Sequence, residues 1–338
     1  MTDKPQISVI MPVYNAASFL SQAVESILVQ TDPNFEFLIF DDGSTDGSID
    51  ILNRFAKSDS RIKVHLGQHR GYSPWLNEGL KAACGEYIAR MDADDIALPD
   101  RFALQVDFLR NHPEVVVVGG VVLAIDSDGD PVYPWQFPMT HDEIDADILV
   151  AKTGGLIHPT TMIRRRAMLE VGGYRPDFEP AEDLDLWLRL AETGKLVNLP
   201  RQLLYYRVHA QSVSKVKWDR QWSQAQRAIA EARIRRGLPP FTLAVRTVHS
   251  PRQLLRDNFW YSWGAGFRQT SRKYAWRVAL DRPFTLEGWL LLARTWAAPA
   301  MHRAASVLGL SRNRQKSLPV ANIAGATPAT HPCPNGET

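Results

Sequence analysis

Residues 87–95 read YIARMDADD, an apolar, strand-like segment followed by three carboxylates within four positions. Crowded carboxylates repel one another, and each costs free energy to bring near an apolar strand end. A hard cation such as Mg²⁺ or Mn²⁺ removes that cost, because it prefers carboxylate oxygens and keeps other coordination positions for phosphate groups. The stretch therefore predicts a metal–diphosphate site at the edge of a sheet. A solvated acidic turn before the helix that begins near Pro99 is the alternative.

The first third of the chain alternates between strand and helix patterns. The predicted strands are Ile7–Met11, Phe35–Phe40, Ile62–Leu66 and Glu86–Met91, and the predicted helices are Ala17–Gln30, Ile49–Ala56 and a third that Ser73 and Pro74 open and Gly85 ends. This alternation predicts βαβ units and a parallel sheet. Such sheets bind ligands outside the carboxyl ends of their strands. Polar clusters follow three of these ends, at 12–15, 41–46 and 92–95, and their coincidence favours a site over a solvated turn.

After residue 99 the composition changes twice, first to basic segments rich in Trp and then to a polar tail. We expect a helix from Pro99 to Asn111, β-branched strand segments at 115–118 and 121–123, a hairpin turn at 126–129, and helices at 142–150, 182–193 and 220–236. Segments rich in Trp and Arg continue to about residue 310, and the polar, Pro- and Ala-rich remainder is typical of a disordered tail. We therefore expect a catalytic domain at 1–212, a basic helical extension at 213–310 and a tail at 311–338.

The net charge of +2 hides an asymmetry. Residues 1–210 hold 19 Lys and Arg against 31 Asp and Glu, a net of −12, whereas residues 211–338 hold 20 against 6, a net of +14. An acidic body suits a metal-using domain. A basic, Trp-rich region suits an anionic membrane surface, and packing of the basic helices on the acidic body is the alternative. We expect no nucleic-acid partner.

Cellular context follows from what the chain lacks. Cys84 and Cys333 form no disulfide framework or metal-binding pattern, which fits a reducing cytosol. The first six residues lack the basic and apolar regions of a signal peptide. No stretch of about 18 uncharged apolar residues occurs, so we expect no membrane-spanning helix. The expected location is the cytoplasm, including peripheral attachment at the inner face of the cell membrane.

Three motifs in this order resemble a known family. They are ISVIMPVYN at 7–15, DDGSTD at 41–46 and DADD at 92–95, supported by Arg70-Gly71 with Asn77 and Gly79, by LPDR at 98–101 and by Glu182-Asp183 ahead of Trp187. Together they make residues 5–212 similar to a family 2 glycosyltransferase. The resemblance implies the GT-A fold, an α/β, Rossmann-like, mostly parallel sheet flanked by helices, here with a helical C-terminal extension. It also implies an inverting transferase that uses a nucleotide-sugar donor.

The resemblance implies a nucleotide-sugar site made of Pro12, Val13, Tyr14, Asn15, Asp42, Arg70, Asp92, Ala93 and Asp94. Tyr14 would lie near the base, Asp42 would accept hydrogen bonds from uracil or another base edge, and Arg70 would face the phosphates. Capping of the next helix by Ser44, Thr45 or Asp46 is the structural alternative for the Asp42 turn. Asp94 would contact Mg²⁺ or Mn²⁺ directly, and Asp92 would reach the ribose or the metal through water. UDP is the favoured nucleotide.

The family's catalytic base matches Glu182-Asp183. These carboxylates open a predicted helix, whose positive N-terminus favours an ionised base, and we assign the base to Asp183 with Glu182 as competitor. His158, Arg207 and His209 also resemble segments that close around the diphosphate or the acceptor, a saccharide or a lipid-linked saccharide. Processive members carry a Gln-x-x-Arg-Trp motif and several membrane spans, and neither is present here. Transfer of a single sugar in polysaccharide, lipopolysaccharide or other glycoconjugate synthesis is therefore expected.

Two other functions compete. An aspartate-dependent phosphatase or phosphotransferase would use Asp92 as nucleophile, but it leaves 12–15 and Asp42 unexplained. A non-catalytic membrane-surface adaptor would work through the C-terminal region, but it leaves the acidic residues without a role. The acidic stretch that begins at Asp126 is no EF-hand loop, because the Gly at the sixth position and the terminal Glu of such a loop are missing. No dinucleotide or P-loop glycine pattern occurs.

Overall fold

The computed structural model describes residues 4–209, 218–243 and 250–307, the last of these without the side chains of 297–307. Its sheet follows the order β3-β2-β1-β4-β8-β6-β9-β5, with β7 paired to β6. The strands are β1 (Ile7–Val13), β2 (Phe35–Asp41), β3 (Ile62–Leu66), β4 (Tyr87–Arg90), β5 (Ile96–Ala97), β6 (Val115–Ile125), β7 (Pro131–Trp135), β8 (Met162–Arg164) and β9 (Lys195–Arg207). Strands β3, β2, β1 and β4 are parallel, whereas β8 is antiparallel to both β4 and β6.

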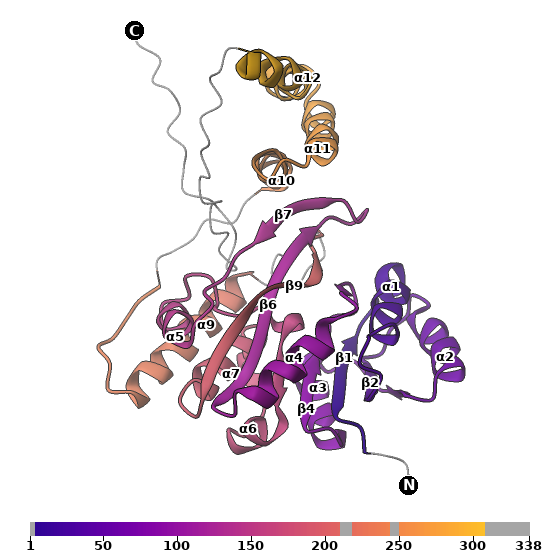
Figure 1. The fold of residues 1–338 in the computed structure, drawn as a ribbon, viewed down its shortest axis with the longest axis vertical. Coiled ribbons are helices and arrows are strands. Elements are labelled where there is room, and N and C mark those ends of the chain that lie inside the picture. The colour runs from indigo at the N-terminus through magenta and orange to yellow at the C-terminus, as the bar shows by residue number, and fades with distance from the viewer. Residues whose placement is uncertain (1–3, 210–217, 244–249, 308–338) are drawn as a thin grey trace.

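Helices cover both faces of this sheet (Figure 1). The helices of the body are α1 (Ala17–Leu28), α2 (Ser48–Ser58), α3 (Tyr72–Ala82), α4 (Arg101–Asn111), α5 (His141–Ile148), α6 (Arg165–Glu170), α7 (Glu182–Leu190) and α9 (Trp218–Arg235), with short 3-10 turns η1 (His158–Thr160) and η2 (Pro176–Phe178). Because both faces are buried, the central strands are almost continuously apolar rather than alternating. This is why their positions could be predicted.

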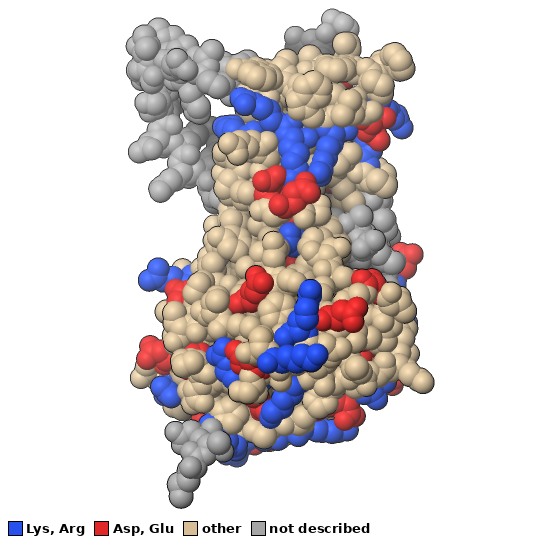
Figure 2. Space-filling view, turned by 90° about the vertical axis from the view of Figure 1, so that its right-hand side faces the viewer, with Lys and Arg blue, Asp and Glu red and all other residues tan. Residues whose placement is uncertain are grey.

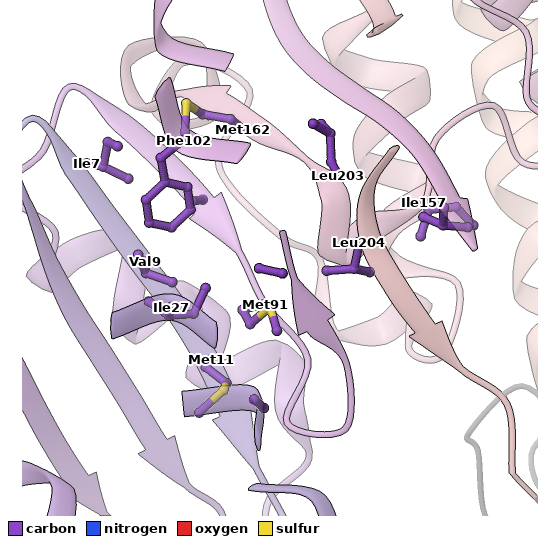
Figure 3. Close-up of a cluster of buried hydrophobic side chains, with 14 of the residues drawn as sticks. Ile7, Val9, Met11, Ile27, Met91, Phe102, Ile157, Met162, Leu203 and Leu204 are labelled. Atoms are coloured by element: carbon purple, nitrogen blue, oxygen red, sulfur yellow. The ribbon is translucent and has the colours of Figure 1, made fainter. Parts of the chain in front are cut away.

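Two cores flank the sheet. Ile7, Val9 and Met11 face the core formed with α1, α2 and α4, and Figure 3 shows Val9 and Met11 close to Ile27 of α1. Ile10, which points the other way, packs in the core formed with α3, α7 and α9. Full burial of each such side chain stabilises the fold by roughly 1.5–3 kcal/mol. The two cores fix the strand ends that carry the polar motifs.

Three further helices form a separate end of the molecule beside β7 (Figure 1). They are α10 (Pro251–Gly264), α11 (Arg268–Asp281) and α12 (Leu286–Val307). Their shared core includes Phe259, Tyr274 and Leu291. Across the described part of the chain, none of the helices combines the length and apolar character that crossing a bilayer requires. The predicted tail at 311–338 and the predicted boundary at 212 lie outside the described residues.

One helix start was predicted wrongly. Helix α3 begins at Tyr72, and Gly71 rather than Ser73 is its N-cap residue. Gly71 has φ of +88°, a conformation that glycine adopts without steric cost. The Ser73 backbone N–H donates to Glu179 Oε2 at 3.1 Å, and Pro74 lies in the first turn, where a missing N–H breaks no helical bond. The predicted hairpin turn at 126–129 is confirmed between β6 and β7.

Candidate active site

The loops after β1 and β2 hold each other in place. Asn15 N–H donates to Ser44 Oγ at 2.9 Å, and Asn15 Oδ1 accepts from the Thr45 N–H at 2.8 Å. Asn15 has φ of +48°, which asparagine tolerates better than most residues. The N-cap residue of α2 is Gly47, which makes no side-chain bond, but Asp46 Oδ1 accepts from the N–H and the Oγ of Ser48, the first residue of α2, at 3.1 and 2.6 Å. Asp46 Oδ2 also accepts from the N–H of Ala17 at the start of α1, so the two polar loops form one unit.

Asp42 lies at the base of this unit and is only 2% exposed. Its carboxylate accepts from the backbone N–H groups of Arg70 and Gly71 at 2.7 and 3.1 Å and from Trp75 Nε1 at 2.7 Å. His69 Nδ1 lies 2.8 Å from the same carboxylate. Asp42 thus organises the 69–71 loop from within. A hydrogen bond to a nucleotide base requires one of these donors to give way, and its role toward the base stays a prediction.

Two aromatic surfaces lie beside that loop. The Tyr14 ring is 49% exposed and stacks on His69 with ring centroids 4.2 Å apart. The exposed guanidinium of Arg70 lies over the Trp75 ring, 3.8 Å from its centroid. A planar base and a diphosphate are the kinds of group that such rings and such a cation bind.

The acidic loop after β4 brings Asp92, Asp94 and Asp95 together, with one oxygen of each within 4.8 Å of the others. Arg90 Nη2 lies 2.6 Å from Asp92 Oδ1, and His209 Nε2 lies 2.8 Å from Asp94 Oδ2. Asp95 Oδ1 accepts from the Arg207 N–H at 2.7 Å, but its buried Oδ2 has no hydrogen-bond partner. Between these carboxylates, Ala93 is 8% exposed.

The electrostatics of this loop fit a divalent cation. Burial, followed by the charges of Asp94 and Asp92, raises the pKa of Asp95 well above its ordinary value. Burial also raises the pKa of Asp92, against the opposing effect of Arg90. Grouped carboxylates with an orphaned buried oxygen form an oxygen-rich donor set of the kind that Mg²⁺ and Mn²⁺ prefer. The observed residues therefore fit such an ion.

Beneath the loop lies Arg101, which is fully buried. Its Nη2 donates to the carbonyls of Arg90 and Thr161 at 2.8 and 3.2 Å. Burial lowers the pKa of Arg101 to about 9, while the charge of Asp95 opposes that fall. Arg101 thus supplies a fixed positive charge behind the carboxylates. Its place in the LPDR motif at 98–101 was the only signal for Arg101 in the sequence.

Glu182 and Asp183 open α7, as predicted, but their surroundings differ. Glu182 is 3% exposed, its Oε2 accepts from Tyr72 Oη at 3.0 Å, and burial raises its pKa well above the ordinary value. Asp183 is partly exposed. The pKa of Asp183 is raised to about 6, mainly by burial; backbone N–H donors and Arg90 oppose the shift, and the charge of Asp92 adds to it. Asp183 is thus the more available proton acceptor at neutral pH.

Arg90 and His158 lie between the two acidic groups. The charge of Arg90 acts on both Asp92 and Asp183. His158 is buried, its Nε2 lies 2.7 Å from Tyr174 Oη, and its Nδ1 lies 3.9 Å from Glu182 Oε1. Burial and the nearby Arg90 lower the pKa of His158 well below its ordinary value, so a neutral imidazole is expected at pH 7. Sequence reasoning missed Arg90 because it stands within an apolar strand segment.

The side chain of Arg207 is buried and makes its hydrogen bonds to other groups of the protein. It is 3% exposed, and its Nε and Nη2 donate to the Asp94 carbonyl and to Gln22 Oε1 at 2.8 and 2.9 Å. Its guanidinium also lies over the Phe19 ring, 4.5 Å from the centroid. The structure brings Arg207 and His209 to the acidic loop, whereas their predicted contact with a diphosphate or an acceptor stays a prediction.

Asp183 also lines a small pocket of about 50 Å³. The same pocket is lined by Trp218, Gln221 and Trp222 at the start of α9, and the two indole rings stack with centroids 5.7 Å apart. Gln221 Oε1 is buried without a hydrogen-bond partner. No sequence motif pointed to these residues, because they lie outside the part of the chain that the resemblance covers.

A sheet edge that joins exposed aromatic rings, a grouped acidic loop and a partly exposed carboxylate is the arrangement expected of a nucleotide-sugar transferase. Residues 8–172 match the sequence profile described as Glycosyl transferase family 2. The chain is 36% identical over 201 residues to the putative glycosyltransferase EpsE of Bacillus subtilis, covering 57% of this chain and 69% of that protein. It is 32% identical over 220 residues to the putative teichuronic acid biosynthesis glycosyltransferase TuaG of the same species, covering 64% and 84%. This protein belongs to glycosyltransferase family 2.

Two solved structures share its fold. One is S. aureus TarS 1-349 in complex with UDP-GlcNAc, with a TM-score of 0.54, 19% identity and coverage of 80% of this chain and 79% of that chain. The other is the mannosyltransferase PcManGT of Pyrobaculum calidifontis in complex with GDP-Man and Mn²⁺, with a TM-score of 0.54, 21% identity and coverage of 93% and 89%. The predicted GT-A fold and the predicted glycosyltransferase activity are confirmed, which sets aside the phosphatase and the adaptor.

Proposed function

We propose that this protein transfers a single sugar from a UDP-sugar to an acceptor hydroxyl with inversion at the anomeric carbon. The observation that carries the proposal is the placement of Asp183, whose partly exposed carboxylate lies within electrostatic reach of Asp92 and Arg90. A proton acceptor and a diphosphate-holding loop therefore belong to one site. UDP-GlcNAc bound to one structural neighbour makes a UDP-sugar a reasonable donor.

The proposed reaction needs no covalent intermediate. Asp183 accepts the proton of the acceptor hydroxyl, and that oxygen forms a bond to the anomeric carbon. The bond between the anomeric carbon and the diphosphate oxygen breaks on the opposite side, and its electron pair leaves with the nucleoside diphosphate. His158 is buried beside Glu182 and bonded to Tyr174, and its lowered pKa keeps the imidazole neutral.

Asp94 and Asp92 are proposed to hold Mg²⁺ or Mn²⁺. When bound, the ion supplies positive charge next to the diphosphate as the sugar–phosphate bond breaks. Arg90 restrains Asp92, and Arg207 restrains the backbone of Asp94. Mn²⁺ in the PcManGT complex is consistent with this use of an acidic loop.

The nucleotide is proposed to lie along Pro12–Asn15, with Tyr14 and Asp42 toward the base and Arg70 toward the phosphates. The acceptor is proposed to be a saccharide or a lipid-linked saccharide that enters beside Trp218 and Trp222, since indole rings offer apolar surface to a sugar ring. His158, Arg207 and His209 are proposed to close the site. The teichuronic acid role in the name of TuaG favours polysaccharide or related glycoconjugate synthesis.

A donor panel tests this proposal. UDP-, GDP-, dTDP- and ADP-sugars are incubated with the full chain and Mn²⁺, and release of the nucleoside diphosphate is measured, with water as the acceptor. We expect release from one or a few UDP-sugars and its loss on chelation of the metal. NMR of the released sugar is expected to show the inverted anomer first. Release of inorganic phosphate from simple phosphate esters, without release from any sugar nucleotide, would contradict the proposal.

We also propose that the C-terminal region at 213–310 attaches the protein peripherally to the inner face of the cell membrane, next to the catalytic unit at 1–212. Its helix α9 packs on the body, so α10, α11 and α12 are proposed to make the attachment. Several of its basic side chains form ion pairs with carboxylates of the body: Arg235 and Arg236 pair with Glu192, and Lys273 pairs with Asp126. The exposed residues of α11 and α12 include several large apolar side chains, among them Leu280, Leu286, Leu290 and Trp296. Figure 2 shows this end of the molecule as a mostly uncharged cap.

A vesicle experiment tests the attachment. The full chain is sedimented with vesicles of phosphatidylglycerol and phosphatidylcholine, and we expect binding that Leu290→Glu weakens by about tenfold, because a charge on a face inserted into lipid is costly. Leu66→Glu is the matched control, since Leu66 is an exposed leucine on β3. Absence of binding to anionic vesicles, or equal binding by both variants and the unchanged protein, would contradict the proposal.

A further inference from the structure

A second acidic turn, distinct from the acidic loop at 92–95, holds the ammonium group of a lysine. Asp126, Asp128 and Asp130 follow β6, and their carboxylates lie within 4.8 Å of one another. Lys273 of α11 places its Nζ 2.6 Å from Asp126 Oδ2 and 2.8 Å from Asp128 Oδ2, and it also contacts Asp130 Oδ2. The ammonium therefore occupies the position that a cation would take. Figure 2 shows basic and acidic side chains adjoining where the helical end meets the body.

The contact is partly shielded from water. Asp126 is 1% exposed, and the Lys273 side chain is 21% exposed. Tyr274 Oη donates to Asp126 Oδ2 at 3.1 Å. Burial alone lowers the pKa of Lys273, but the three carboxylates more than offset it and raise the pKa above its ordinary value. Lys273 thus stays charged, and shielding from water strengthens the attraction relative to an exposed ion pair.

The same turn contacts the acidic loop through Arg207. Arg207 Nη1 donates to the Asp126 carbonyl at 3.1 Å, and its Nε donates to the Asp94 carbonyl at 2.8 Å. The Arg207 backbone N–H donates to Asp95 Oδ1 at 2.7 Å. Ile125, which precedes the turn, pairs with Arg207 in the register of β6 and β9. A shift of the 126–130 turn therefore also shifts Arg207 and its hydrogen bonds to Asp94 and Asp95.

We propose that Lys273 is a positioning residue for the metal-binding loop. It fixes the 126–130 turn, the turn fixes the Arg207 guanidinium, and Arg207 fixes the backbone and side chain of the loop at Asp94 and Asp95. The three-helix end of the molecule thereby shapes the site that holds the donor diphosphate. This inference rests on the proposed function, because it assigns Asp94 to the metal and diphosphate.

Lys273→Met tests the proposal, with Arg277→Gln as its control. Arg277 stands one turn later on α11 and pairs with Asp128 at 2.9 Å, but no hydrogen bond or ion pair joins it to Asp126 among the described residues. Calorimetry with UDP and Mn²⁺ is expected to give a Kd about tenfold higher for Lys273→Met and nearly unchanged for Arg277→Gln. Lys273→Arg, which keeps the charge, is expected to restore most of the affinity.

Hydrogen exchange supplies a readout independent of catalysis. The Arg207 amide, which donates to Asp95, is expected to exchange about tenfold faster in Lys273→Met, whereas Arg277→Gln leaves it unchanged. If Lys273→Met does not fold, Tyr274→Phe removes one bond to Asp126 without leaving a charge unpaired and should shift exchange in the same direction. Unchanged Kd and unchanged exchange in the folded variant overturn the proposal. If the unaltered protein binds no Mn²⁺–UDP, the proposed function fails, and the exchange result still decides whether Lys273 positions the loop.

Discussion

Asp183→Asn is expected to lower the turnover of the preferred donor by about 10²–10⁴-fold, the usual contribution of a general base. The amide keeps the shape of the side chain and can still accept a hydrogen bond from the Leu184 N–H, as Asp183 Oδ1 does at 2.7 Å. It cannot take a proton from an acceptor hydroxyl. Affinity for UDP with Mn²⁺, measured by calorimetry, is expected to stay within about twofold, because Asp183 is not assigned to the diphosphate.

Glu182→Gln is the matched control for this variant. Glu182 is buried and bonded to Tyr72, so its amide variant is expected to act on packing more than on proton transfer. A turnover that survives in Asp183→Asn but collapses in Glu182→Gln would move the base to Glu182. A turnover that survives in both would place the base elsewhere.

The assignment of Asp183 as the base also predicts how kcat/KM of the unaltered enzyme depends on pH. Burial raises the pKa of Asp183 to about 6, so the carboxylate is ionised above that pH and becomes protonated below it. The protonated form cannot accept the acceptor's proton, and kcat/KM is therefore expected to fall about tenfold per pH unit below pH 6. In Asp183→Asn this acidic limb should disappear from the residual rate.

Asp94→Asn is expected to weaken Mn²⁺-dependent UDP binding by about 100-fold or more. Loss of an outer-shell partner of a metal ligand already costs about 10–100-fold, and a neutral amide removes a ligand charge outright. Asp94 is partly exposed, and its Oδ2 lies 2.8 Å from His209 Nε2, so the replacement leaves no buried charge unpaired and the fold should persist. Binding is measured by calorimetry, and folding by circular dichroism.

Asp100→Asn serves as the control for that variant. Asp100 is an exposed carboxylate that makes no side-chain cap bond to α4. Asp100→Asn therefore makes the same chemical change at a position outside the proposed metal site. We expect its UDP affinity to equal that of the unaltered protein. Equal affinities for all three proteins would remove Asp94 from the metal site.

The parallel core of the fold was readable from the sequence, because buried parallel strands appear as apolar runs. Strand β3 falls at its predicted bounds, and β1 and β2 begin at theirs. The grouping of Asp92 with Asp94 at a sheet edge followed from the same topology. The start of α3 was missed because Ser-Pro is a common opening, whereas the positive φ of Gly71 is a property of the folded backbone.

Other parts of the site could not be predicted, since they depend on long-range contacts. Arg90 and Arg101 are buried counter-charges, and an isolated charge in an apolar segment does not reveal its partner. Lys273 meets Asp130 across 143 positions of the chain. The charge asymmetry indicated that the basic C-terminal region has a partner, and the ion pairs of α9 and α11 show that the acidic body is one such partner.

A metal-dependent diphosphate site at Asp92–Asp95 is the property on which the proposed transfer reaction rests. Calorimetric titration of UDP into the full chain, once with Mn²⁺ and once with excess chelator, measures that property without knowledge of the sugar or the acceptor. We expect saturable binding with Mn²⁺ and at least about a tenfold loss of affinity with chelator. UDP binding of equal affinity in both titrations would contradict it.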